Sequence, residues 1–193
     1  MVSRSKDTVR EQSISARTAR SSEEISAAGM SIANHDWAGL CPGQLVTCFV
    51  SMPTEPPTED LRTKLLDLGK AVALPIMKSG NSLAWGFDGT ELVKNSYGIF
   101  EPLRAEIDLA KASAILIPAL RVGLDGSRLG RGAGYYDRAL ASVPTYATGG
   151  PVRICLVFDD EVDGSVPSEP HDALIDLIVT PTQIIRIKST QTK

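Results

Sequence analysis

The chain has 193 residues, of which 42% are apolar, and its 20 basic and 23 acidic side chains give a formal net charge of −3. This length and composition are enough for one well-packed core, so we expect a single domain over residues 1–193 whose core spans about residues 6–182. The basic residues are dispersed outside the N-terminal segment and one glycine-rich stretch, which argues against a nucleic-acid-binding surface.

Targeting and redox signals are weak. No apolar run approaches the roughly 20 residues that span a bilayer, and the N-terminal residues lack the apolar centre of a secretory signal, so we expect a cytoplasmic protein with no membrane partner. The three cysteines are an odd number without C-x-x-C spacing, which supports neither a disulfide framework nor a zinc site. Cys48 and Cys155 lie in apolar runs and are predicted to be inert core residues.

The first third of the chain alternates helical and strand patterns. Residues 6–20 predict a first helix, and Ser21 with Glu24 has the capping-box pattern of a second. A buried strand is predicted over residues 45–52. Thr58 is expected to cap the helix that follows this strand.

The rest of the chain continues the alternation. Residues 71–76 predict a strand, and Trp85 falls in a hairpin-like or irregular section. Further strands are predicted over residues 114–118, 154–158 and 174–180. The pattern predicts an α/β fold, a single-domain three-layer sandwich with a mostly parallel sheet and helices on both faces. Ligands of such folds gather beyond the carboxyl ends of the strands.

The most informative stretch is RLGRGAGYYDR at residues 128–138, with three glycines, three arginines and one carboxylate between an apolar run and a helix-compatible segment. In a strand, glycine loop and helix, unpaired backbone N–H groups face an anion, and Arg128 and Arg131 can add bidentate hydrogen bonds to phosphate. Asp137 beside a phosphate needs an intervening cation, which indicates Mg²⁺. The alternative is a tight turn with solvated arginines, the commoner outcome for a glycine loop alone.

These eleven residues resemble the defining motif of the 5-formyltetrahydrofolate cyclo-ligase family. Other segments resemble that family in the same order, so that the resemblance covers about residues 6–180. They are the Lys-x-x-x-Arg pattern of Lys6 and Arg10, residues 49–55, the Asn-x-x-Gly-Ile-x-Glu-Pro pattern of residues 95–102, the Pro-His-Asp of residues 170–172 and the closing strand at residues 178–180.

The resemblance implies an enzyme that converts 5-formyltetrahydrofolate and ATP into 5,10-methenyltetrahydrofolate, ADP and phosphate. The implied route is phosphorylation of the formyl oxygen followed by attack of N10. It implies ATP and Mg²⁺ as cofactors and small-molecule substrates as the partners. We expect a monomer.

The resemblance also implies roles for individual residues. Nucleotide contacts are implied at Lys6, Asp7, Thr8, Val9 and Arg10, and at Arg128, Leu129, Gly130, Arg131, Gly132, Ala133, Gly134, Tyr135 and Tyr136. Substrate contacts are implied at Val50, Glu55, Gly132 and Tyr135, with Glu55 accepting hydrogen bonds from the pterin. Arg131 and Tyr136 are the implied catalytic residues. Asp137 and Asp172 are the implied magnesium ligands, with Glu169 as the alternative to Asp172.

Other interpretations stay open. Lys6 and Arg10 also fit a solvated helix, and Glu55 fits a polar surface turn. The sequence departs from the family at Ala133, where Gly or Lys is frequent, and at residues 121–124, a segment expected to adjoin the folate pocket. The alternative functions are a paralogue that uses the same ATP and Mg²⁺ site on another substrate, and a non-catalytic nucleotide- or folate-binding protein.

Overall fold

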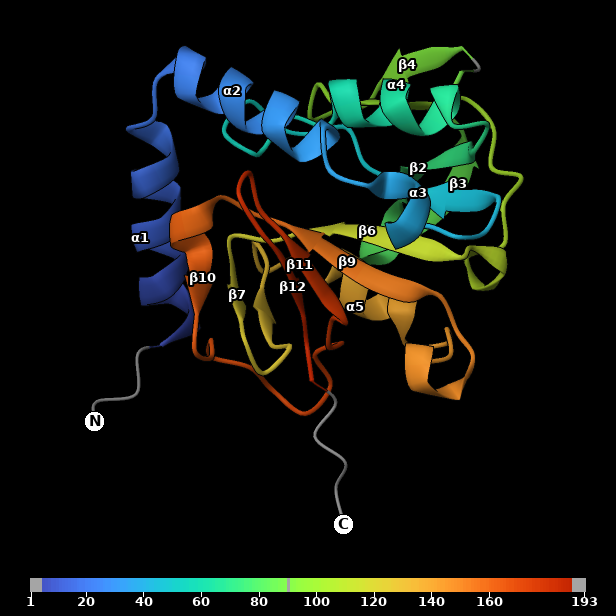
Figure 1. Ribbon diagram of the computed structural model, residues 1–193. Helices are drawn as coiled ribbons and strands as arrows, with labels where there is room; N and C mark the ends of the chain where they lie inside the picture. The colour runs from blue at the N-terminus through green and yellow to red at the C-terminus, as the bar shows by residue number, and fades with distance from the viewer. Residues whose placement is uncertain (1–4, 90, 189–193) are drawn as a thin grey trace.

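The structure is a computed structural model that describes residues 5–89 and 91–188 (Figure 1). Residues 1–4, on which the absence of a secretory signal partly rests, and both ends of the predicted 1–193 domain lie outside the described residues. A seven-stranded sheet has the order β12-β11-β9-β6-β1-β2-β3. Its strands are β1 (Leu45–Thr47), β2 (Ala71–Lys78), β3 (Ser82–Phe87), β6 (Ala114–Pro118), β9 (Val152–Leu156), β11 (Leu177–Val179) and β12 (Ile184–Arg186).

Neighbouring strands of this sheet pair in parallel except at the two edges, where β3 and β12 pair antiparallel. The antiparallel pair of β2 and β3 is the hairpin predicted around Trp85, and its turn is a short 3₁₀ helix, η1 (Ser79–Asn81). The remaining strands form two small sheets. These are β4 (Leu92–Lys94) with β5 (Phe100–Pro102), and β10 (Val162–Asp163) with β7 (Arg121–Gly123) and β8 (Arg128–Leu129).

The helices are α1 (Lys6–Thr18), α2 (Ser22–Ala33), α3 (Trp37–Leu40), α4 (Glu59–Asp67) and α5 (Tyr135–Leu140). In Figure 1, α2 and α4 lie on one side of the sheet, α5 lies on the other, and α1 stands beside β10 and β7. The capping box predicted at Ser21 and Glu24 is present. Within the described part of the chain, no helix is both long and apolar enough to cross a membrane.

Side chains of the central strands alternate between two apolar clusters. On β6, Ala114 and Leu116 pack with residues of α2, α3 and α4, whereas Ile115 and Ile117 pack in the cluster that contains Leu140 of α5. Strands β9 and β11 alternate in the same way. A strand covered on both faces buries every side chain, which explains the continuous apolar runs in the sequence. The predicted mostly parallel sheet with helices on both faces is confirmed.

Two local predictions are wrong in detail. The strand predicted over residues 45–52 pairs only over β1, and Thr58 makes no side-chain cap on α4. The Thr58 hydroxyl donates to the Phe49 carbonyl at 2.5 Å and accepts from the Ser51 N–H at 3.3 Å. The Phe49 carbonyl is therefore paired with a side chain rather than with a neighbouring strand.

A buried ion pair attaches α1 to the rest of the molecule. Arg17 donates to both carboxylate oxygens of Glu161 at 2.7 Å and to the Ala119 carbonyl at 2.6 Å. The Glu161 carboxylate also accepts from the Phe158 N–H at 3.0 Å. Arg17 and Glu161 are only 1% and 2% exposed, so neither charge has water as a substitute partner.

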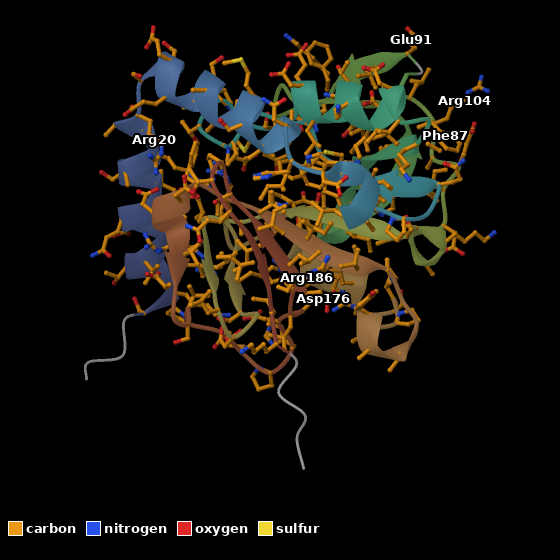
Figure 2. All side chains as sticks on the ribbon, in the orientation of Figure 1. Arg20, Phe87, Glu91, Arg104, Asp176 and Arg186 are labelled. Atoms are coloured by element: carbon orange, nitrogen blue, oxygen red, sulfur yellow. The ribbon has the colours of Figure 1, made fainter. Side chains whose placement is uncertain are left out.

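Replacing Arg17 should therefore strongly destabilise the protein. We expect Arg17→Met to lower the free energy of unfolding by about 3–5 kcal/mol, because the carboxylate of Glu161 stays buried without its cation. Urea denaturation followed by circular dichroism measures this change. The matched control is Arg186→Met on the exposed surface of β12 (Figure 2), and a loss no larger than the control's would contradict the assignment.

The three cysteines, Cys41, Cys48 and Cys155, are free and buried. Burial raises the pKa of each thiol to about 12. The predicted core position of Cys48 and Cys155 is confirmed, and because the thiolate is the reactive form, we expect both to be inert.

Thiol titration tests this environment. At mildly alkaline pH the folded protein should not react with an aromatic disulfide reagent, and all three thiols should react after unfolding in guanidinium, because unfolding returns their pKa to the ordinary range of about 8.5. Rapid release of the reagent's thiolate by the native protein would show that one of these cysteines is accessible.

Candidate active site

A cavity of about 950 Å³ opens beyond the carboxyl ends of β1 and β6. Its walls include Phe49 and Val50 after β1, and Pro118 and Leu120 at the end of β6. The strand order reverses at this point, because the chain leaves β1 toward β2 on one side and later returns to β6 on the other. Open α/β sheets bind ligands at such switch points.

The glycine-rich stretch forms one wall of the cavity. Residues 130–137 line it, between the end of β8 and the first turn of α5. The stretch does not follow β6 directly, as the sequence suggested, because the β7–β8 hairpin is inserted between them. Gly132 and Gly134 have φ angles of +99° and +69°, which glycine adopts at little cost.

The backbone of this wall presents donors. No hydrogen bond joins the N–H groups of residues 131–137 to any other part of the described chain. The carbonyls of the loop are occupied instead, since Gly130 accepts from Arg10 at 3.1 Å and Ala133 accepts from Arg138. Successive unpaired N–H groups beside a cavity are suited to binding an anion such as phosphate.

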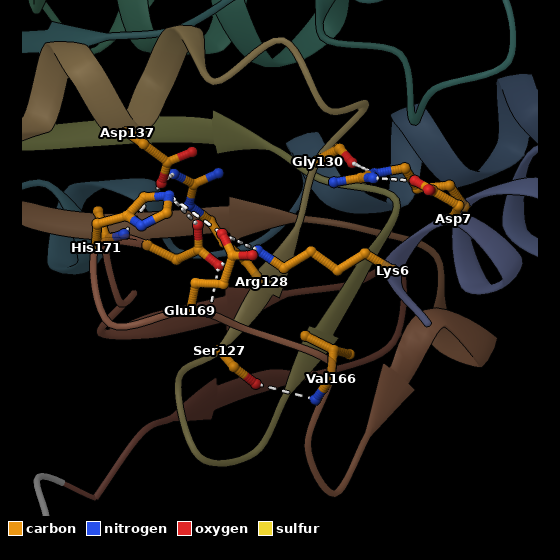
Figure 3. Close-up of polar contacts among 12 residues, drawn as sticks. Lys6, Asp7, Ser127, Arg128, Gly130, Asp137, Val166, Glu169 and His171 are labelled. Carbon is orange, nitrogen blue, oxygen red and sulfur yellow. Dashed lines mark hydrogen bonds and ion pairs between the residues drawn. The ribbon is translucent and has the colours of Figure 1, made fainter. Parts of the chain in front are cut away.

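The first turns of α1 bring cations to the same cavity. Lys6 and Arg10 are four residues apart, and both line the cavity. The Lys6 ammonium contacts Asp172 at 2.7 Å and Glu169 at 3.2 Å (Figure 3). Arg10 pairs with Asp7 at 2.5 Å while it donates to the Gly130 carbonyl. This arrangement gives the helix face a role beyond that of a solvated surface.

Two of the residues implied by the resemblance lie elsewhere on α1. Thr8 is exposed and Val9 is buried, and neither lines the cavity. Val9 packs with Leu129 and Val166 in a small apolar cluster. The structure therefore does not support nucleotide contacts by the side chains of Thr8 and Val9, because the helical period turns them away from the face of Lys6 and Arg10.

Arg128 and Asp137 form a partly buried pair beneath the loop. Arg128 is 6% exposed and donates to an Asp137 oxygen at 2.5 Å, and the same oxygen accepts from the Ala173 N–H at 3.0 Å. The interpretation as a turn with solvated arginines is therefore wrong for Arg128. Its Nε atom is buried and has no partner in the described chain, although Arg128 borders the cavity.

A second acidic group lies on the C-terminal segment. Potential ligand atoms of Glu169, His171 and Asp172 all lie within 4.8 Å of one another. Asp137 is not a member of this group, but all four residues line the same cavity. Oxygen-rich groups beside a phosphate cradle fit the preference of Mg²⁺ for carboxylates together with phosphates and water.

The Asp172 carboxyl titrates below its usual range. Burial disfavours its charged form, but the hydrogen bonds from Lys6 and from the Glu169 N–H outweigh burial, so that its pKa is lowered. His171 approaches Glu169 at 3.3 Å and Asp172 at 3.6 Å and is mostly exposed. Lys6 of α1 thus stabilises the negative charge of the cluster that contains Glu169 and Asp172.

Glu55 lies on the opposite wall. It is 7% exposed, and one of its carboxylate oxygens accepts from the Met52 N–H at 2.9 Å, which fixes the turn after β1. The other oxygen lies 3.4 Å from the guanidinium of Arg131. Val50 lines the cavity next to this turn. The implied substrate residues and the glycine-rich loop therefore meet across one cavity, and Glu55 is not the solvated surface residue of the alternative interpretation.

Both tyrosines of the loop line the cavity. The Tyr136 hydroxyl is buried without a partner among the described residues, and its burial raises the pKa of the phenol. Its ring makes an edge-to-face contact with Trp85 at 6.1 Å between centroids. A buried hydroxyl beside a cavity is a group that a bound ligand can satisfy.

The hairpin of β4 and β5 also lines the cavity, although no site residue is predicted there from the sequence. Its anchor is the partly buried Asn95, which donates to Glu101 at 3.1 Å, and Glu101 accepts from the Met77 N–H at 3.1 Å. Tyr97 and Phe100 are 69% and 44% exposed at the edge of this wall. The Asn-x-x-Gly-Ile-x-Glu-Pro pattern was the sequence signal for this wall, because its two polar residues, Asn95 and Glu101, form the hydrogen bond that anchors it.

Residues 121–124, which are expected to adjoin the folate pocket, directly follow Leu120 of the cavity wall, but none of the four lines the cavity. Arg121 pairs with Asp163 at 2.6 Å and also donates to the Asp160 carbonyl, which joins β7 to the segment around β10. Arg121, which departs from the family pattern, therefore forms a local ion pair outside the cavity.

Comparisons with known proteins agree with this geometry. The sequence profile of the 5-formyltetrahydrofolate cyclo-ligase family matches residues 2–181. A 5-formyltetrahydrofolate cyclo-ligase of Mycolicibacterium smegmatis is 38% identical over 149 residues, which cover 72% of this chain and 74% of the relative. The enzyme of the same name from Escherichia coli K12 is 32% identical over 146 residues, 72% of this chain and 79% of the relative.

Solved structures show the same fold. The 5,10-methenyltetrahydrofolate synthetase of Aquifex aeolicus superposes with a TM-score of 0.82 at 22% identity, covering 97% of this chain and 95% of that one. The synthetase of Mycoplasma pneumoniae gives 0.73 at 21% identity, covering 92% and 99%. The fold and cavity define an α/β enzyme of the cyclo-ligase class. The chain belongs to the 5-formyltetrahydrofolate cyclo-ligase family.

The contact between Lys6 and the acidic cluster can be tested by titration. Because the interaction lowers the pKa of Asp172, it stabilises the fold above the unfolded carboxyl pKa of about 3.9 and is lost as the pH falls through the lower folded value. Lys6→Met should raise the pKa of Asp172. NMR titration of the Asp172 side-chain carbon measures it in both proteins, and an unchanged pKa in the variant would contradict the contact.

Proposed function

We propose that the protein catalyses the ATP-dependent conversion of 5-formyltetrahydrofolate to 5,10-methenyltetrahydrofolate, with release of ADP and phosphate. The observation that carries this proposal is that one cavity holds both a run of unpaired backbone N–H groups and the residues that the family resemblance assigns to folate. Enzymes that couple two substrates by phosphoryl transfer need both of them in a single cavity, in contact with each other.

The phosphate end of the cavity is built from backbone donors and cations. The N–H groups of residues 131–137, together with Lys6 and Arg10, would bind the triphosphate. Asp137 and the Asp172 cluster would hold Mg²⁺, which supplies charge neutralisation between the phosphates and the carboxylates. In phosphoryl transfer, alignment and electrostatic stabilisation provide most of the catalysis.

The folate end comprises Val50, Glu55 and Tyr135, with Gly132 between the two ends. Glu55 is buried and held by its own turn, so its carboxylate can accept hydrogen bonds from the amino and N–H groups of a pterin. Arg131 lies at the boundary, within 3.4 Å of Glu55. Its guanidinium is therefore placed to contact the group that passes between nucleotide and folate.

The chemistry follows from the poor reactivity of a formamide, whose oxygen is a poor leaving group. Transfer of the γ-phosphoryl group to the formyl oxygen breaks the bond to ADP and forms a phosphate ester. N10 then attacks the activated carbon, the carbon–oxygen bond breaks, and the oxygen departs in inorganic phosphate while N10 loses its proton. Arg131 stabilises charge on the transferred group, and the unpartnered Tyr136 hydroxyl donates a hydrogen bond at the reacting oxygen.

Two other functions would use the same cavity. A paralogue would keep the nucleotide end and act on another acylated amine, and a binding protein would hold nucleotide or folate without turnover. Magnesium separates catalysis from binding, because phosphoryl transfer requires the metal whereas folate binding does not.

The direct test is to mix the protein with 5-formyltetrahydrofolate, ATP and Mg²⁺ and to follow methenyltetrahydrofolate by its absorbance. Asp137→Asn should lower turnover at least about a hundredfold while folate binding changes little, because a metal ligand is lost but the amide keeps an acceptor for Arg128.

Asp67→Asn is the matched control, since Asp67 is exposed at the end of α4. Metal- and ATP-dependent product from the wild type and from the control supports the proposal. Absence of product from folded wild-type protein that binds ATP would favour the paralogue. Full turnover by Asp137→Asn would refute the metal role of Asp137.

A further inference from the structure

We propose that Asn81 and Arg138 are positioning residues that orient the phosphate-binding loop through the carbonyl of Ala133. This inference rests on the proposed function and extends it to two residues outside the implied site. Asn81 lies in η1, the turn between β2 and β3, and Arg138 lies in α5. Arg138 borders the cavity and Asn81 does not, and both would act on the nucleotide through the Ala133 carbonyl.

Two hydrogen bonds join these residues to the loop, and a third joins them to each other. The Arg138 guanidinium donates through Nη2 to the Ala133 carbonyl and through Nε to the Asn81 carbonyl at 2.9 Å. The Asn81 side-chain amide donates to the same Ala133 carbonyl at 3.3 Å. One carbonyl oxygen thus receives two donors from segments that are 52 and 5 residues away in sequence. We call these contacts the Ala133 clamp.

The clamp matters because of peptide geometry. In a trans peptide the C=O and the following N–H point in opposite directions, so fixing the Ala133 carbonyl also fixes the Gly134 N–H. The Gly134 N–H belongs to the unpaired run on the cavity wall. A flipped peptide would replace this donor with a carbonyl oxygen, which repels phosphate.

The loop needs such a device because of its glycines. Ala133 lies between Gly132 and Gly134, both in the left-handed region, where glycine also has other conformations within easy reach. The Gly130 carbonyl, earlier in the same loop, is held in an equivalent way by a hydrogen bond from Arg10. Arginines therefore hydrogen-bond to the carbonyls of Gly130 and Ala133, and the N–H groups of the loop stay available to a ligand.

Asn81 lies in the tight turn of the β2–β3 hairpin. Its φ angle is +53°, and it is the one non-glycine residue with positive φ in the described part of the chain. Gly80 before it also has positive φ, which is the ordinary geometry of a tight hairpin turn, and asparagine adopts it more readily than most residues. Here the turn delivers both a carbonyl to Arg138 and an amide to Ala133.

The variants separate the loss of the Ala133 clamp from a general loss of folding. Asn81→Gly removes the amide but accepts positive φ without strain, and Arg138→Ala removes both guanidinium bonds. Arg138→Lys keeps the charge and one donor, and serves if the alanine variant does not fold. Arg186→Ala, at an exposed position on β12, is the control for loss of an arginine. Thermal unfolding confirms that each variant is folded.

Steady-state kinetics with each substrate varied in turn, together with calorimetric titration of MgATP, provide the readout. We expect Arg138→Ala to raise the KM and the Kd for ATP about tenfold, and Asn81→Gly about threefold, with the KM for 5-formyltetrahydrofolate within about twofold of the wild type. Arg138→Lys should recover part of the loss. Unchanged ATP affinity in folded Arg138→Ala, or an equal rise in both KM values, would overturn the clamp.

Failure of the clamp can be distinguished from failure of the proposed function. If the wild type lacks turnover but binds MgATP, calorimetry still compares the variants, and the clamp predicts the same loss of ATP affinity. If the wild type turns over normally and the variants bind MgATP as tightly as it does, the proposed function stands and the clamp is wrong.

Discussion

The proposed phosphate site depends on the direction of a few peptide groups in one loop. Residues 131–137 leave their N–H groups unpaired, and side chains of α1, η1 and α5 engage carbonyls of the same loop. Backbone donors arranged in this way carry partial positive charge and need no further adjustment when an anion arrives. Glycine permits the arrangement, and arginine holds it in place.

The fold brings the other necessary groups to that loop. The reversal of strand order between β1 and β6 leaves space beyond their carboxyl ends, and the buried ion pair of Arg17 with Glu161 fixes α1 beside it. Lys6 and Arg10 then reach the cavity from the first turns of α1. Because Lys6 contacts Asp172, two segments that are 166 residues apart in sequence meet at the site. The ion pair that attaches α1 therefore also positions the two cations of the proposed nucleotide site.

The sequence predicts those features that depend on local pattern. The capping box at Ser21, the two-sided burial of β6 and the glycine-rich loop before α5 follow from spacing and composition. Thr58 was misassigned because its hydroxyl could act as a cap by accepting from the first N–H groups of α4, and only the tertiary structure shows that it donates to the Phe49 carbonyl instead.

Local sequence patterns do not predict contacts between residues that are far apart in the chain. Nothing near Arg17 in sequence indicates Glu161, which is 144 residues away. Arg128 is predicted as a phosphate ligand by its position in the motif, whereas the structure shows it buried against Asp137. Asn81 has no motif, and its link to Ala133 depends on the hairpin of β2 and β3 lying beside the loop. The role of each implied site residue stays a prediction until ligands are measured.

The most direct test of this account is to follow the backbone amide resonances by ¹H–¹⁵N NMR while MgATP is added. The account predicts that the largest shifts fall on residues 131–137, with smaller ones near Lys6 and Arg10. Saturable binding of MgATP that leaves the amides of residues 131–137 unchanged would contradict the central claim that this loop is the phosphate site.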